Sequence, residues 1–113
     1  MTEIISLPDL AAEQLAAAQA STAGRASRTL PHSPGSRLRQ SVLALVAGHA
    51  LGEHQSPGEA TLQVLLGRVI LSAGADDWEA VAGDHLALPP TRHNLTAVGD
   101  AAILLTVVAE APR

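Results

Sequence analysis

The sequence predicts an all-β domain, an antiparallel β-barrel or sandwich that is preceded by a single helix. After residue 36 the chain consists of short runs rich in Val, Ile, Leu and Thr, and Gly, Pro and Asp separate these runs. Runs that return about every ten residues with turn residues between them are typical of sandwiches and barrels. Only the first quarter of the chain is rich in strong helix formers.

The first element in chain order is a helix over residues 7–21. This segment, LPDLAAEQLAAAQAS, is rich in Ala, Leu, Glu and Gln, and its leucines recur at near-helical spacing. Ser6 is suited to cap the first turn, Pro8 is tolerated there, and Asp9 places a carboxylate at the positive end of the helix dipole. These signals predict that the helix begins near residue 7.

A connector follows, over residues 21–36. Its composition changes to Ser, Thr, Gly, Pro and Arg, which disfavours regular structure apart from a short strand near residues 26–30. We therefore divide the chain into an N-terminal helix and connector, residues 1–36, and a β domain, residues 37–113.

The apolar alternation of the later runs predicts which side chains form the core. Gly67 separates two of these runs and predicts a tight turn. Trp78 is the single aromatic residue of the chain, so it is expected to be a packing anchor in the core or at a dimer contact. The predicted core residues are Leu62, Val64, Leu66, Leu86, Leu88, Leu95 and Leu104.

Composition argues against several classes of protein. The chain has no Cys, its formal charge is −4, and its basic residues are scattered, so neither disulfides nor nucleic-acid binding is expected. No apolar stretch approaches the roughly 20 residues that cross a bilayer. The acidic start, MTEIISLPDL, does not resemble a secretory signal, and we expect a cytoplasmic protein with no membrane or nucleic-acid partner.

Two segments resemble the paired motifs of the cupin superfamily. They are GHALGEHQSPGEATLQVLLG, residues 48–67, and GDHLALPPTRHN, residues 83–94, and the resemblance extends over about residues 38–109. The segments GEATLQVLLGRV and AAILLTVV are also similar to the small single-domain, RmlC-like cupins of bacteria. This resemblance implies a conical double-stranded β-barrel, or jelly roll, in which three His and one Glu hold a divalent metal such as Zn, Fe, Mn or Ni.

The resemblance assigns metal-ligand positions to named residues. His54 and His93 match the first and the last ligand His, whereas Ser56 and Ala60 stand where the family has its second His and its Glu. Two imidazoles are fewer than the three or four protein ligands of tight divalent sites. His54 and His93 are therefore the candidate metal ligands, and they are also candidate ligand-binding residues of the barrel pocket.

Glu59 is the third candidate for ligand binding. It precedes the family's Glu position by one residue, and successive side chains of a strand point to opposite faces, so Glu59 reaches the cavity only if the chain bulges there. The alternative is a solvated loop carboxylate. His93 is in phase with Leu95 and is expected inside the barrel, either lining the pocket or as an ordinary interior histidine with a hydrogen bond.

Two functions are compatible with this sequence. The first is a cupin binding module that holds a small molecule or a divalent metal in its barrel pocket. The alternative is a metal-dependent enzyme, of oxygenase or isomerase type, that uses His54 and His93; no catalytic residue is evident. We also expect a homodimer, because the apolar side chains of the first 36 residues need a surface to cover them.

Overall fold

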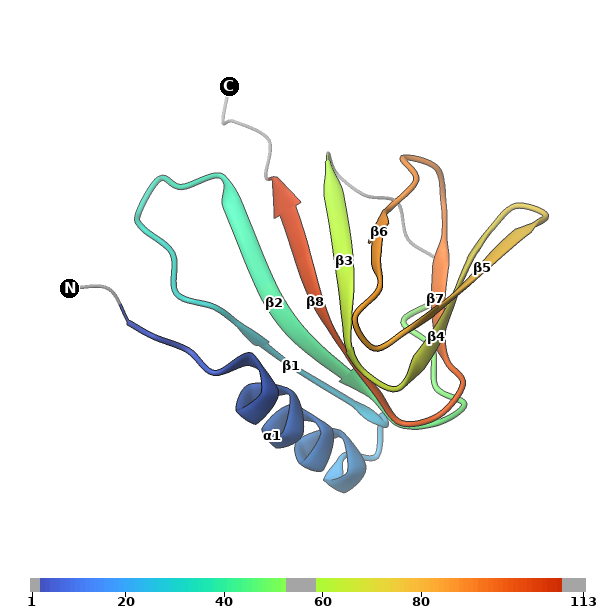
Figure 1. Cartoon of the computed structure of the whole chain (residues 1–113), viewed down its shortest axis with the longest axis horizontal. Helices are drawn as coiled ribbons and strands as arrows, with labels where there is room; N and C mark the ends of the chain where they lie inside the picture. The colour runs from blue at the N-terminus through green and yellow to red at the C-terminus, as the bar shows by residue number, and fades with distance from the viewer. Residues whose placement is uncertain (1–2, 53–58, 109–113) are drawn as a thin grey trace.

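A computed structural model describes residues 3–52 and 59–108 of the chain, so His54 and Ser56 lie outside the described residues. One helix and eight strands occur in these ranges, as the sequence predicted for an all-β domain with an N-terminal helix (Figure 1). Their bounds are α1 Leu7–Ala20, β1 Arg25–Thr29, β2 Leu38–Leu45, β3 Ala60–Leu66, β4 Arg68–Ala73, β5 Asp76–Val81, β6 His85–Ala87, β7 Asn94–Ala97 and β8 Ala101–Val108.

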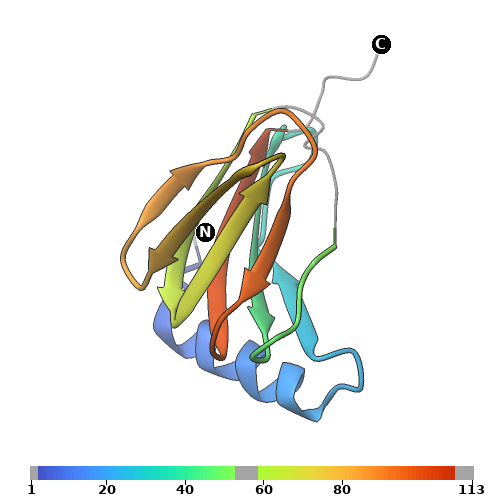
Figure 2. The same cartoon turned by 90° about the vertical axis from the view of Figure 1, so that its right-hand side faces the viewer.

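The strands form two antiparallel sheets. The larger sheet has the order β1-β2-β8-β3-β6 and the smaller one the order β5-β4-β7. Figures 1 and 2 show the two sheets facing each other, with β5 splayed away from β6 so that the barrel is open on that side. The sheet edges at β5 and β6 therefore border an opening rather than pairing with each other.

The main core lies between the two sheets. Its side chains come from alternate positions of the strands, as expected when one face of each sheet is buried. Three of the predicted core residues, Leu62, Val64 and Leu95, are almost fully buried in this layer, and Leu86 and Leu88 pack against it.

Leu66 and Leu104 were also predicted in the core, but they lie in a different layer. The register between β3 and β8 shifts after Val64, which pairs with Ile103, so that Leu66 pairs with Ala102. A bulge of this kind inserts one residue and reverses which face the following side chain occupies. Leu66 consequently packs beneath the helix rather than between the sheets. Leu104 lies in the same layer for a simpler reason: it pairs with the outward-facing Gln63 and alternates with the inward-facing Ile103, so the predicted phase of β8 was wrong by one residue.

Helix α1 covers the outer face of the larger sheet. The Ser6 hydroxyl accepts the Asp9 N–H at 3.3 Å, which is the predicted cap. Leu10, Ala11 and Ala18 are the buried side chains of the helix, and they pack against β2 and β8 (Figure 1). The helix thus buries its apolar face within its own chain.

The homodimer stays a prediction. The prediction was based on the apolar side chains of the first 36 residues, and most of these side chains contact the sheet of the same chain. Ile4 is the exception, since it is 97% exposed. In the described part of the chain, no helix is long and apolar enough to cross a membrane.

Asp100, in the turn between β7 and β8, ties the helix to the barrel. Its carboxylate accepts the Ala47 N–H at 2.9 Å and the side-chain amide of Gln19 at 2.9 Å. Both bonds lower the pKa of the Asp100 carboxyl below its ordinary value of 3.8, and the bond from the Ala47 N–H has the larger effect. The charged carboxylate is therefore the form that the folded state favours.

We expect Asp100→Ala to lower the stability of the fold at neutral pH. Because the folded-state pKa is depressed, the charge contributes fully above the unfolded value and its contribution is lost as pH falls below 3.8. Urea unfolding of both proteins at neutral pH and below that value measures the difference. A gap in midpoint that stays constant with pH would show that the charge is irrelevant, and Glu13→Ala, at an exposed helix carboxylate, is the control.

Candidate functional site

His93 lies inside the barrel, directly before β7, with only 2% of its surface exposed. It borders a small internal cavity of about 20 Å³, and it is the one polar side chain among the described residues that line this cavity. A cavity of this size accommodates about one water molecule. The lining consists of Leu51, Leu62, Leu71, Leu88, His93, Leu95, Ile103 and Leu105.

A hydrogen bond fixes the orientation of the His93 ring. Nδ1 lies 2.9 Å from the carbonyl oxygen of Thr91. A carbonyl only accepts, so Nδ1 carries the proton, and in the neutral ring Nε2 is the atom with the lone pair. The sequence left open whether His93 lines the pocket or is an interior histidine with a hydrogen bond, and the structure shows both features together.

The described lining does not fit a divalent metal. Ala60, at the position where the family has its carboxylate, is 8% exposed and offers no donor atom. Among residues 3–52 and 59–108, no three His, Asp or Glu side chains lie close enough together to hold a metal ion. One imidazole among aliphatic side chains is a poor donor set, because such sites need three or four ligands.

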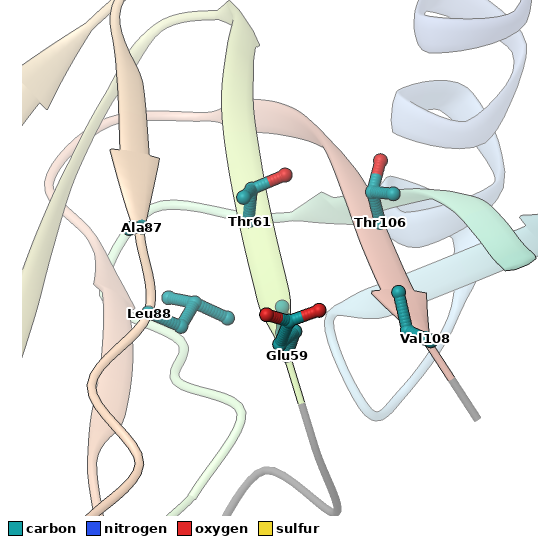
Figure 3. A pocket seen from close by; sticks show the side chains of 7 residues that line it. Glu59, Thr61, Ala87, Leu88, Thr106 and Val108 are labelled. Carbon is teal, nitrogen blue, oxygen red and sulfur yellow. The ribbon is translucent and has the colours of Figure 1, made fainter. Parts of the chain in front are cut away.

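Glu59 does not join His93. It lies directly before β3 and lines a groove of about 430 Å³, together with Thr61, Thr106 and Val108 (Figure 3). Thr61 pairs with Thr106 across β3 and β8, and both point away from the face that Leu62 buries. Glu59 is therefore on the outer face of the larger sheet, where the alternation of strand residues places it.

Trp78 is not in the core, so the first of its two expected positions is wrong, and the dimer contact stays a prediction. It is 44% exposed, because β5 is the edge strand of the smaller sheet and no strand covers it on the open side of the barrel. Trp78 pairs with the buried Leu71 of β4, so its side chain is on the inner face of the sheet. The indole therefore borders the opening between β5 and β6 and does not lie on the outer face of the smaller sheet.

A cleft of about 390 Å³ lies at this opening, between β5 and β6. Its described lining is mostly apolar, and the polar groups are the Trp78 indole and the His85 imidazole. Leu71 lines both the cleft and the internal cavity next to His93, so the two spaces are adjacent. The lining residues of the cleft are Leu71, Trp78, His85, Leu86, Ala87 and Pro89.

Sequence reasoning did not find this cleft. The signal that could have found it is the run DDWE at positions 76–79, where a large apolar side chain stands between carboxylates that cannot be buried. A strand of this composition is suited to an edge and not to the middle of a sheet.

The fold is similar to that of solved cupin structures. A conserved protein of unknown function from Streptococcus pyogenes matches with a TM-score of 0.70 and 28% identity, over 81% of this chain and 80% of that one. A cupin superfamily protein from Desulfitobacterium hafniense matches with a TM-score of 0.70 and 20% identity, over 76% and 78% of the two chains.

An enzyme is also among the similar structures. A mutant of salicylate 1,2-dioxygenase from Pseudoaminobacter salicylatoxidans matches with a TM-score of 0.71 and 20% identity, over 87% of this chain but only 32% of the enzyme. No protein-family model and no curated protein sequence matches the chain. This chain has the cupin fold, which confirms the resemblance that its two motifs indicated.

Proposed function

We propose that this chain is a binding module that holds a small, mainly apolar molecule in the cleft between β5 and β6. The observation that carries the proposal is the cleft itself, about 390 Å³ in volume and bordered by a half-exposed Trp78. Small-molecule sites are concave, mostly apolar and a few hundred Å³ in volume, with a few polar groups that orient the ligand.

The inner end of the ligand is directed toward His93. Leu71 lines both the cleft and the internal cavity, so a ligand in the cleft that displaces this side chain approaches His93. His93, held by Thr91, then provides a fixed polar contact in an aliphatic surrounding. The binding module is favoured over a metal-dependent enzyme because Ser56 and Ala60 stand at two of the four positions where the family has its metal ligands.

Trp78→Ala should weaken binding of an apolar probe about tenfold, since the indole supplies much of the contact surface. The probe is 3,3-dimethyl-1-butanol, titrated into the isotopically labelled full chain while amide chemical shifts are recorded. Saturable shifts should gather on β4, β5 and β6. Val81→Ala is the matched control, because Val81 is 41% exposed on the same strand but faces the opposite side.

Shifts that do not saturate, or that gather beneath helix α1 instead, would contradict this site. Equal affinities of the Trp78→Ala and Val81→Ala variants for the probe would also contradict it.

A further inference from the structure

We infer that the ligand of the β5–β6 cleft carries a positive charge, as an organic ammonium group that lies against Trp78. This inference rests on the proposed function and adds the chemical class of the ligand. It follows from which charged side chains share a face with Trp78 and which do not.

Asp76 is on the same face of β5 as Trp78. The residues that pair with β4 are Asp76 with Ala73, Trp78 with Leu71, and Ala80 with Val69. Ala80, Leu71 and Val69 are all buried in the core between the sheets, so these alternate positions of β5 face inward. Two residues along a strand span roughly 7 Å. Asp76 does not itself line the cleft, and its carboxylate lies one inward-facing position beyond the indole, next to the β4–β5 turn.

The other carboxylates of β5 are directed elsewhere. Glu79 is on the outer face, where it forms an ion pair with Arg68 at 3.0 Å. Asp77 is also on the outer face, opposite Ser72. Asp76 is therefore the acidic group of this strand that acts on the inner side.

His85 is the one ionisable side chain among the described residues that line the cleft. None of the described residues that line the cleft is an Arg, and the chain contains no Lys. A cation is attracted to the face of an indole, most strongly where water is partly excluded, and a nearby carboxylate adds to this attraction. A neutral ligand would gain from the apolar walls but not from these two features.

The test compares two probes of equal shape. Choline carries a quaternary ammonium group, and 3,3-dimethyl-1-butanol is its uncharged carbon analogue. Because Trp78 is the only Trp and the chain has no Tyr, intrinsic fluorescence reports on this site alone. At low salt and mildly alkaline pH we expect choline to bind at least fivefold more tightly than the alcohol, and added salt should reduce this preference.

Two variants with the same change of charge identify the group responsible. Asp76→Asn should lose most of the preference for choline, whereas Asp77→Asn, on the outer face of the same strand, should retain most of it. Equal affinity for both probes would overturn the cationic ligand while leaving the proposed binding module intact. Failure of both probes to bind would overturn the two proposals together, and a preference that survives Asp76→Asn would refute the role of Asp76.

Discussion

Gly67→Ala is expected to destabilise the fold by at least about 3 kcal/mol. Gly67 forms the turn between β3 and β4 with a φ of +77°, a conformation that costs an L residue about 1–2 kcal/mol. In addition, a Cβ at this position would lie 2.2 Å from the backbone oxygen of Asp100. Backbone atoms cannot move aside as a flexible side chain can, so the β7–β8 turn itself would have to shift.

The matched control is Gly74→Ala, in the turn between β4 and β5. Gly74 has a φ of +60°, but a Cβ there would meet no atom within 4 Å. This variant should therefore lose only the conformational part, about 1–2 kcal/mol. Chemical denaturation of both variants gives the comparison, and similar losses would mean that the close approach to Asp100 is not a constraint.

Leu62→Ala should cost about 2–5 kcal/mol of unfolding free energy, the second large effect. Leu62 is 1% exposed at the centre of the layer between the sheets, and it also lines the internal cavity next to His93. Removing its side chain deletes apolar contacts and enlarges a cavity that the surrounding strands cannot close.

Gln63→Ala, at the next position of β3, provides the comparison for Leu62. Gln63 is exposed on the outer face, so its loss should change stability by no more than about 0.5 kcal/mol. Equilibrium unfolding in urea distinguishes the two. Comparable losses at both positions would contradict the assignment of inner and outer faces in β3, on which the placement of Glu59 also depends.

Much of the fold could be predicted from the sequence because its signals are local. The Ser6 cap and the helix formers after it specify α1, and turn residues between short apolar runs specify the strands. The alternation within one strand also places Leu62 inside and Glu59 outside. The cupin motifs add the barrel, since they resemble a family in which these segments are neighbouring strands.

Tertiary structure alone decided which surfaces these faces meet. The bulge in β3 moves Leu66 under the helix, and the helix covers its own sheet. Likewise β5 is an edge strand, so Trp78 borders an open cleft and not the core. Periodicity reports the face on which a side chain lies, but the order of the strands determines what lies opposite that face, and this order depends on contacts between residues far apart in the chain.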